Sequence, residues 1–387
     1  MPMQRRNFLR LTAMSSGILV LGPGFWRAAY AAPARPGPGP YGAISGSPDA
    51  HGLRLPAGFT SRIIARTGQN VPGTNYTWHL APDGGACFDT GDGGWVYVSN
   101  SEIPLLGGVS SIRFDGGGNV VDAYRILSNT SINCAGGPTP WGTWLSCEEW
   151  DLGHVWECDP RSPSQGQRRS ALGAFTHEAV AVDPVGQRLY LTEDRPEGRF
   201  YRFTPSQWPS LGTGRLEAAK LNGNALDGTA SFSWVKVSAS RSASLQLERF
   251  LTTAFNGGEG CWYDSGTVYF TTKGDNRVWA HTPATGQVEV IYDDDLYPDS
   301  PLRGVDNITM SRSGDLFVAE DGGDLQLCLI TPGPERTVAP FLQLDGHAGS
   351  ELTGPAFSPD GRRLYFSSQR GTDGTTGVTF EVSGPFR

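Results

Sequence analysis

The 387-residue sequence lacks the short motifs that mark several common kinds of site. It has no C-x-x-C and no H-x-x-x-H pair, so the usual spacing of a structural zinc site is missing. It has no G-x-S-x-G turn and no phosphate-cradling glycine loop, which argues against a serine hydrolase and a nucleotide-binding protein. It also has no basic stripe, and its formal net charge of −8 disfavours nucleic acid as a partner.

The N-terminal apolar run, residues 11–21, is too short to cross a bilayer, which takes about 20 apolar residues. It follows the pair Arg5-Arg6 and precedes a small-x-small cleavage site at Ala29-Tyr30-Ala31. These parts, in this order, predict a twin-arginine signal peptide over residues 1–31, cleaved near Ala31. We therefore expect export by the twin-arginine machinery, a periplasmic or extracellular location and no stable membrane insertion.

Removal of this peptide would make the chain more acidic. The first 31 residues contain four arginines and no acidic residue, so 27 basic and 39 acidic residues would remain, a net charge of −12. An anionic substrate would then need local positive charge, from metal ions or from a few arginines. The six cysteines of an exported protein can form disulfides.

One local pattern recurs six times: a turn with glycine, then alternating apolar and aromatic residues, then polar or acidic residues. The copies are GGWVYVSNSE (93–102), WGTWLSCEE (141–149), GQRLYLTEDR (186–195), SGTVYFTTKGD (265–275), SGDLFVAEDG (313–322) and DGRRLYFSSQR (360–370). Their central aromatic residues stand 46–48 residues apart, except for one step of 79. Repeats of this length built from strands predict an all-β fold, a six-bladed β-propeller.

The long step predicts an insertion between the third and fourth blades, between Tyr201 and Phe255. Within it, the pattern of residues 244–255 favours a short amphipathic helix.

Residues 32–48 have the Pro/Gly-rich composition of a flexible linker, which leaves residues 49–387 as a single propeller domain. We expect residues 58–68 to close the ring as an outer strand beside residues 377–385, because propellers protect their sheet edges. We expect a monomer.

Acidic residues and one thiol occupy equivalent positions in these repeats. Eight residues before a turn glycine, or at the matching place in a shorter turn, stand Cys134, Glu178, Glu259, Asp306 and Thr353. Further acids end the second strand of each hairpin: Glu102, Glu148, Glu149, Glu193, Asp194, Asp275, Glu320 and Asp321. The start and the end of an antiparallel hairpin are neighbours, so both sets should meet at one mouth of the channel.

Carboxylates packed in this way repel one another unless cations neutralise them. Oxygen ligands suit calcium, and a thiolate such as that of Cys134 suits a transition-metal ion. Any single acid can instead be a solvated strand end, and His177 is interpreted as a packing residue or a support for a ligand. Arg195, Lys273, Arg303 and Arg370 are each a surface charge, unless one or two of them bind an anion beside the metals.

The chain resembles the PhoX-type alkaline phosphatases. The matching segments are NCAGGPTPWGTWLSCEE (133–149), FTHEAVAVDP (175–184), LYLTEDRPEGRFYRF (189–203), FNGGEG (255–260), RGVDNITMSRSGDLFVAEDGG (303–323) and ELTGPAFSPDG (351–361). The resemblance covers roughly residues 50–387, and it implies a six-bladed propeller that hydrolyses small-molecule phosphomonoesters at a cluster of Ca²⁺ and Fe³⁺ ions.

The resemblance also implies roles for individual residues. Cys134 would be the thiolate ligand of iron, Glu178 and Glu259 would be iron or calcium ligands, and Glu148 or Glu149 would bind metal from the next strand. Glu193, Asp306, Glu320 and Asp321 would complete the set of metal ligands. Arg195 would bind the substrate anion, and with Glu178 and Glu259 it forms the expected catalytic set.

This chain is shorter than the best-known members of the family, so substrate-binding loops can be missing. Two other interpretations therefore remain open at this point. One is a calcium-dependent lactonase-like hydrolase, and the other is a non-enzymatic, metal-stabilised propeller that binds a partner.

Overall fold

The computed structural model of the chain describes residues 32–240 and 243–387. The predicted signal peptide, residues 1–31, lies outside the described residues. Within the described ranges, all regular secondary structure is β-strand or short 3-10 helix, so the predicted all-β class is confirmed. No helix in this part of the chain is long and apolar enough to span a membrane.

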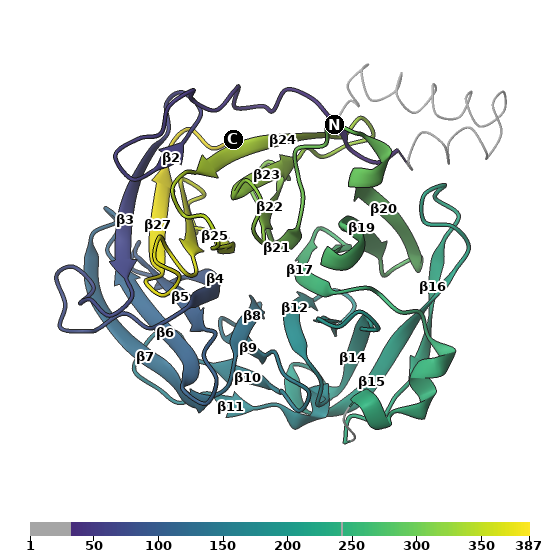
Figure 1. Cartoon of the computed structure of the whole chain (residues 1–387). Helices are drawn as coiled ribbons and strands as arrows, with labels where there is room; N and C mark the ends of the chain where they lie inside the picture. The colour runs from purple at the N-terminus through teal and green to yellow at the C-terminus, as the bar shows by residue number, and fades with distance from the viewer. Residues whose placement is uncertain (1–31, 241–242) are drawn as a thin grey trace, which may run out of the picture.

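The strands are arranged around a centre in a propeller-like ring (Figure 1). Three sheets have four antiparallel strands each. The first is β4 (Pro82–Asp89), β5 (Trp95–Ser101), β6 (Gly107–Phe114) and β7 (Val120–Thr130). The second is β8 (Asn133–Pro138), β9 (Trp144–Glu148), β10 (Val155–Cys158) and β11 (Gln167–Arg168). The third is β25 (Leu352–Phe357), β26 (Arg363–Ser368), β27 (Val378–Ser383) and β3 (Thr60–Arg66).

Two larger sheets complete the ring. The six-stranded sheet contains β21 (Val305–Met310), β22 (Leu316–Glu320), β23 (Gln326–Ile330) and β24 (Thr337–Leu344), with β1 (Arg35–Pro36) and β2 (Leu53–Arg54) on β24. The nine-stranded sheet contains β12 (His177–Asp183), β13 (Arg188–Glu193), β14 (Tyr201–Gln207), β15 (Ser210–Asn222), β16 (Ser231–Lys236), β17 (Gly258–Asp264), β18 (Thr267–Thr272), β19 (Arg277–Thr282) and β20 (Gln287–Asp293).

The described residues therefore form five hydrogen-bonded sheets, whereas the sequence predicts six separate blades and an insertion. The nine-stranded sheet holds two antiparallel runs, β12–β15 and β17–β20, which β16 joins. β16 pairs along its length with β15 and meets β20 only at Ser231 and Gln287. The extra residues between the third and fourth repeats thus supply a strand that links the two antiparallel runs of this sheet.

The amphipathic helix predicted over residues 244–255 is wrong. The segment instead forms two 3-10 turns, η2 (Ala243–Leu245) and η3 (Leu247–Leu251). Arg249 in these turns is 7% exposed, because its guanidinium binds the Glu193 carboxylate at 2.9 Å and the Glu197 carbonyl. This ion pair draws a charged residue inward, and the neighbouring Phe250 is 85% exposed. The remaining 3-10 turns are η1 (Ser170–Leu172), η4 (Lys273–Asp275) and η5 (Asp294–Leu296).

Residues 32–48, expected as a flexible linker, are packed against the propeller. Ala34 is fully buried and donates its N–H to the Ile291 carbonyl at 2.7 Å. β1 pairs in parallel with β24, and the Tyr41 ring contacts the Phe59 and Phe341 rings with centroids 5.4 Å away. Apolar and aromatic residues among the prolines and glycines explain why this segment docks.

The ring closes as predicted, by pairing of an early strand with the last one. β3 lies antiparallel to β27, from Thr60 opposite Ser383 to Arg66 opposite Val378. Glu381 in β27 is 1% exposed and binds three groups across this sheet. Arg62 on β3 and Arg363 on β26 each approach its carboxylate at 2.7 Å, and the Tyr365 hydroxyl donates to it at 2.7 Å.

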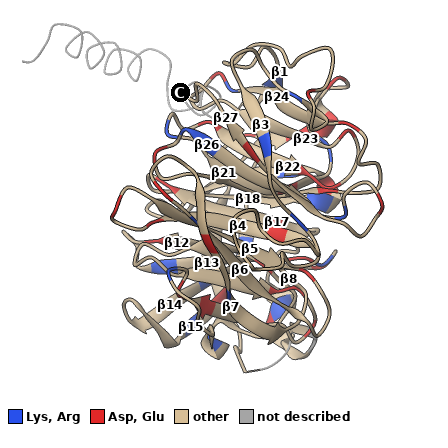
Figure 2. Ribbon diagram, turned by 90° about the vertical axis from the view of Figure 1, so that its left-hand side faces the viewer, with Lys and Arg blue, Asp and Glu red and all other residues tan. Residues whose placement is uncertain are grey.

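In a side view the described Lys and Arg residues are interspersed with Asp and Glu, as expected from the missing basic stripe (Figure 2). Five of the six central aromatic residues of the repeats lie in the core, and Tyr269 is partly buried. Trp144, for example, is 2% exposed and donates its indole N–H to Asn100 Oδ1 of the preceding sheet at 2.9 Å. The repeated aromatic residue thus binds one sheet to the next.

We predict that Glu381→Gln lowers the free energy of unfolding at pH 7 by about 2 kcal/mol, since it removes the charge that two arginines share across the closing strands. Burial alone would raise the pKa of Glu381, but hydrogen bonds from Arg62 and Tyr365 hold this pKa below its usual value. Its stabilising effect is therefore present above the unfolded pKa of about 4.3 and disappears as the pH falls through the folded pKa. Denaturant unfolding of both proteins at pH 7 and pH 3 measures this difference.

The matched control is Asp92→Asn, which makes the same carboxylate-to-amide change in an exposed ion pair with Arg113. Its effect should be much smaller than that of Glu381→Gln. Equal effects of the two variants at pH 7 would show that the Glu381 network does not stabilise the closure.

Candidate metal centre

The hairpins next to the channel all end in the same backbone hydrogen bond. In each, the residue directly after the second strand donates its N–H to the carbonyl of the residue directly before the first strand. The six donor–acceptor pairs are Glu102–Ala81, Glu149–Ile132, Asp194–Thr176, Lys273–Gly257, Asp321–Gly304 and Gln369–Glu351. These bonds establish which positions of the repeats are structurally equivalent.

Two sets of side chains follow from this equivalence. We call the six donors the outer ring: Glu102, Glu149, Asp194, Lys273, Asp321 and Gln369. We call the residues two positions after each acceptor the inner ring: Asp83, Cys134, Glu178, Glu259, Asp306 and Thr353. Five of the six inner-ring residues are those that the spacing from the turn glycines places together.

Small residues next to the inner ring let the hairpins approach closely. Gly84, Gly260 and Gly354 each follow an inner-ring residue directly. A Cβ atom on Gly260 would lie 2.6 Å from the Ile308 nitrogen, and one on Gly84 would lie 2.5 Å from the Ala135 Cα. Larger side chains at these glycines would push the ring residues apart.

Three inner-ring carboxylates form one compact group. Oxygen atoms of Glu178, Glu259 and Asp306 all lie within 4.8 Å of one another, and all three residues are buried. The amide of Asn307 donates to Asp306 Oδ1 at 2.8 Å and reaches Glu178 Oε1 at 3.5 Å.

A second group joins the two rings around the thiol. Ligand atoms of Glu102, Cys134 and Glu149 also lie within 4.8 Å of one another. Cys134 Sγ is 3.3 Å from Glu178 Oε1, so the thiol lies between the two groups. One sulfur and five carboxylates thus surround a single region at the end of the channel.

Burial and mutual repulsion disfavour the charged forms of these acids. Burial, followed by the neighbouring Glu259 and Glu149, raises the pKa of Glu178 well above its usual value. Burial and Glu102 raise the pKa of Glu149 to about 9. Burial and nearby carboxylates, Asp83 first, likewise raise the pKa of the Cys134 thiol. A bound cation would favour the ionised forms instead.

Lys273 is the outer-ring residue with a positive charge. Its ammonium Nζ lies 2.8 Å from Glu259 Oε1, 3.1 Å from Asp321 Oδ2 and 3.9 Å from Asp194 Oδ2. One lysine therefore offsets part of the negative charge on one side of the rings. The opposite side is held by an amide, since Gln369 donates to Asp83 Oδ2 at 2.5 Å and to Glu102 Oε2 at 2.6 Å.

The structure does not bring Glu148, Glu193 and Glu320 to this centre, although the sequence predicts them as metal ligands. Each stands one position before an outer-ring residue, and alternation along a strand turns it to the other side. Each instead accepts hydrogen bonds from backbone N–H groups: Ser131 and His154 for Glu148, Arg199 for Glu193, and Arg303 and Gln326 for Glu320. These carboxylates hold the loops around the centre.

The other predicted residues have clear positions. Asp321 lies in the outer ring and approaches Lys273. Arg195 follows the outer-ring Asp194 and forms an ion pair with Asp151, and its Nε donates to Thr176 Oγ1 at 3.2 Å. His177 is buried, stacks on Phe175 with centroids 3.6 Å apart, and faces the Gly173 carbonyl, as its packing interpretation expects.

Sequence reasoning missed Asp83 and Glu351. Asp83 lies eight residues before Gly91, which is the same spacing as in four of the other repeats. The first repeat also has glycines at 93 and 94, and counting back from these later glycines does not lead to Asp83. Glu351 directly precedes β25, and its carbonyl accepts the Gln369 N–H. Its carboxylate binds Arg370 at 2.6 Å. Burial and Asp321 raise its pKa to about 8.

Cysteine pairing plays no part in the described centre. All six cysteines lie in the described ranges, and all are free thiols. Cys147 is fully buried in an apolar cluster with Leu145 and Val155.

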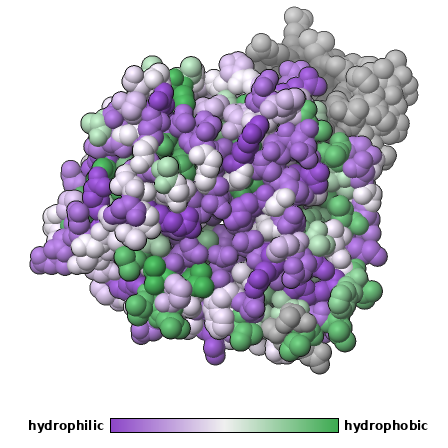
Figure 3. Space-filling model, viewed as in Figure 1, coloured by the Kyte–Doolittle hydropathy of each residue, from purple (hydrophilic) through white to green (hydrophobic). Residues whose placement is uncertain are grey.

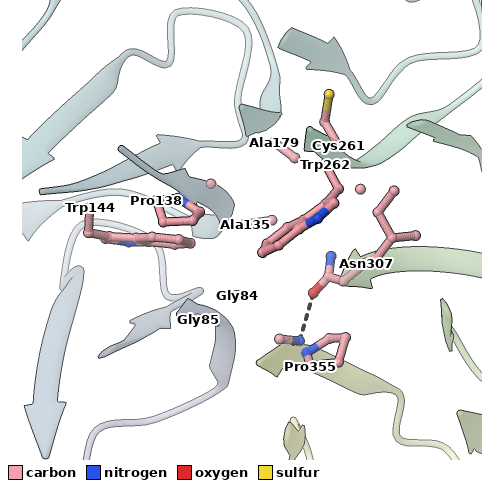
Figure 4. Close-up of a pocket in the computed structure, with 14 residues that line it drawn as sticks. Gly84, Gly85, Ala135, Pro138, Trp144, Ala179, Cys261, Trp262, Asn307 and Pro355 are labelled. Atoms are coloured by element: carbon pink, nitrogen blue, oxygen red, sulfur yellow. Dashed lines mark hydrogen bonds between the residues drawn. The ribbon is translucent and has the colours of Figure 1, made fainter. Parts of the chain in front are cut away.

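Deeper along the channel lies a cavity of about 30 Å³. Figure 4 shows Trp262 and Asn307 on one side of it and Pro138 and Trp144 on the other. Asn307 Oδ1 accepts the Gly354 N–H at 2.7 Å, which ties neighbouring hairpins together beneath the acids. The cavity has room for about one water molecule, so the polar centre has little space beyond it in this direction.

Comparisons with known proteins found one similar family and several structures of similar fold. The family model described as alkaline phosphatase PhoX matches residues 116–152 and 150–295. These ranges contain Cys134, Glu149, Glu178 and Glu259 and end before Asp306. A search of curated proteins finds no match to the sequence.

Several solved structures have a similar fold. PhoX of Pseudomonas fluorescens, solved in complex with vanadate, a transition state analogue, has a TM-score of 0.69 at 16% identity, covering 88% of this chain and 97% of that chain. A Bacteroides thetaiotaomicron protein of unknown function has a TM-score of 0.52 at 11% identity, covering 84% of this chain and 76% of that chain. At these identities the structures show a shared fold.

The family match spans the hairpins that supply the thiol and three of the five carboxylates, and the fold agrees with it over most of the chain. The chain is similar to the PhoX-type alkaline phosphatase family over residues 116–295, and it shares the fold of PhoX over most of its length.

Proposed function

We propose that this protein is a metal-dependent phosphomonoesterase whose reaction takes place at the two rings. The observation that carries the proposal is the meeting of five carboxylates and the Cys134 thiol in two adjoining groups of metal-ligand spacing. The family match supports phosphate ester hydrolysis as the chemistry.

The residues present fit the Ca²⁺ and Fe³⁺ ions expected from the family. Carboxylate and amide oxygens suit calcium, and the single thiol suits iron. Glu178 Oε2 is buried and has no hydrogen-bond partner among the described residues, so it is available as a ligand atom. Glu178, Glu259 and Asp306 would hold one part of the cluster, and Glu102, Cys134 and Glu149 would hold the other.

When bound, such ions neutralise a phosphate group, polarise its P–O bonds and lower the pKa of water. The chain supplies the positioning. The rings fix the ligands, Lys273 reduces the repulsion between Glu259 and Asp321, and Arg195 lies beside them to bind a phosphate oxygen. These roles need no serine or histidine nucleophile, in agreement with the missing motif.

The proposal includes the finer architecture. Six four-stranded units can be counted when the nine-stranded sheet is divided at β16 and the short strands β1 and β2 are set aside, and this count matches the six equivalent hydrogen bonds. The residues around β16 would then be the insertion between the third and fourth blades. Twin-arginine export, a periplasmic or extracellular location and a monomeric state also belong to the proposal, and the motif over residues 1–31 supports export.

We predict that the purified, metal-loaded protein releases phosphate from a chromogenic phosphomonoester at alkaline pH, and that a chelator abolishes this. Cys134→Ser should lose iron and lower kcat at least 100-fold, because the hard hydroxyl replaces the thiolate ligand. Elemental analysis and initial rates measure both effects. Cys87→Ser is the control, since Cys87 is outside both metal-ligand groups, and it should keep metal content and rate.

Full activity of Cys134→Ser with calcium alone would contradict the role of the thiol and favour a lactonase-like calcium site. A protein without bound metal would favour a non-enzymatic propeller.

We predict that the metal-free protein becomes less stable as the pH rises from 5 to 9. The pKa of Glu149 is raised to about 9 and that of Glu351 to about 8, against about 4.3 in the unfolded chain. A raised folded pKa gives stability that is complete below the unfolded pKa and is lost as the pH rises through the folded pKa.

Thermal unfolding of chelator-treated, desalted protein at several pH values tests this. Millimolar calcium should remove the decline, because the cation binds the ionised carboxylates of the folded state. A metal-free protein whose Tm stays constant or rises over this range would contradict the predicted repulsion.

A further inference from the structure

A groove runs outward from the rings past Arg195. Two clefts, of about 520 Å³ and 390 Å³, share the lining residues Asp151, Thr176 and Arg195 and therefore adjoin. The outer-ring residues Glu149 and Asp194 line the first cleft, so the groove begins at the candidate metal centre. We call this space the Arg195 groove.

Each cleft has an aromatic residue in its wall. Trp150 lines the first cleft and is 37% exposed, and Phe250 lines the second and is 85% exposed. Trp150 comes directly after the outer-ring Glu149, which fixes one aromatic side chain next to the acids. The groove thus has one aromatic side chain near the acids and a second one farther out, among Glu197, Arg199 and Arg249.

The segment that carries Phe250 has its polarity reversed. Leu247, Phe250 and Leu251 are 70%, 85% and 63% exposed, whereas Gln246 and Arg249 are 2% and 7% exposed. In the view of Figure 3, green hydrophobic atoms gather at the lower right, where Figure 1 draws the η3 turn. Exposed apolar side chains beside a site are typical of ligand recognition.

Buried contacts hold this reversed segment in place. Arg249 binds Glu193, and Glu193 also accepts hydrogen bonds from the Arg199 N–H and the Tyr201 hydroxyl at 2.9 Å each. The Arg199 guanidinium donates to Thr252 Oγ1 at 2.7 Å. Because these bonds fix both sides of Phe250, its exposed position is built into the fold.

We propose that the Arg195 groove binds the apolar alcohol part of the substrate, so that this enzyme prefers aromatic or alkyl phosphomonoesters to polar ones. The inference rests on the proposed phosphatase function. A phosphate held at the rings and by Arg195 would direct its ester oxygen along the groove, toward Trp150 and then Phe250. The groove has a volume typical of small-molecule sites, and its walls combine three arginines and several acids with the apolar surface of Trp150 and Phe250.

Steady-state kinetics with two substrates test the preference. For the metal-loaded wild type, kcat/KM should be at least tenfold higher for 1-naphthyl phosphate than for glycerol phosphate. The double variant Trp150→Ala/Phe250→Ala should lose about tenfold or more on naphthyl phosphate and less than twofold on glycerol phosphate, as expected when an apolar contact is removed. Val185→Ala is the control, because Val185 is also 85% exposed but lies in the turn between β12 and β13, outside the groove.

Binding of non-hydrolysable phosphonates separates this inference from the proposed function. Calorimetry should give at least tenfold tighter binding of phenylphosphonate than of methylphosphonate, and the double variant should lose this difference. If no ester is hydrolysed but this difference is found, the phosphatase proposal fails and the apolar subsite stands. Equal binding of the two phosphonates, or equal loss on both substrates in the double variant, would overturn the inference.

A lipid surface is the competing occupant for these exposed side chains. Sedimentation with phosphatidylcholine vesicles distinguishes it. Wild-type protein that binds vesicles through Trp150 and Phe250, while showing no preference between the phosphonates, would assign the apolar residues to a membrane surface and overturn the proposal.

Discussion

Repulsion between carboxylates that the fold forces together is the constraint on which the rest of the structure depends. Glu178, Glu259 and Asp306 are buried with their oxygens within 4.8 Å of one another, and the Cys134 thiol joins them to Glu102 and Glu149. Lys273 approaches Glu259, and Gln369 approaches Glu102, both from the outer ring. Bound cations would offset this repulsion, because each ionised carboxylate is attracted to the cation, and binding to the folded state stabilises it.

The surrounding structure can be understood as the support for this arrangement. Glycines beside the inner ring allow the hairpins to approach, and Glu148, Glu193 and Glu320 fix the adjoining loops through backbone N–H groups. The network around Glu381 joins the first and last strands of the ring, so the hairpins cannot separate easily. Rigid support of this kind would hold the proposed ligands in place before metal ions bind.

The sequence predicted the strand repeats, the closure of β3 on β27 and the common position of Cys134, Glu178, Glu259 and Asp306, because these depend on spacing within hairpins. It did not predict which of two adjacent acids faces the centre, since that depends on where the strand ends; Glu149 faces the rings and Glu148 does not. It missed Asp83 because of a longer turn. It also placed a helix where burial of Arg249 against Glu193 favours 3-10 turns with exposed apolar residues.

Anomalous X-ray scattering from crystals of protein purified after export by its own host tests the central claim most directly. Data collected on both sides of the iron absorption edge locate any iron and distinguish it from calcium. The account predicts an iron signal within bonding distance of Cys134 Sγ and further ions among Glu178, Glu259 and Asp306. Rings without metal in an active enzyme, or metal bound only at other positions, would contradict it.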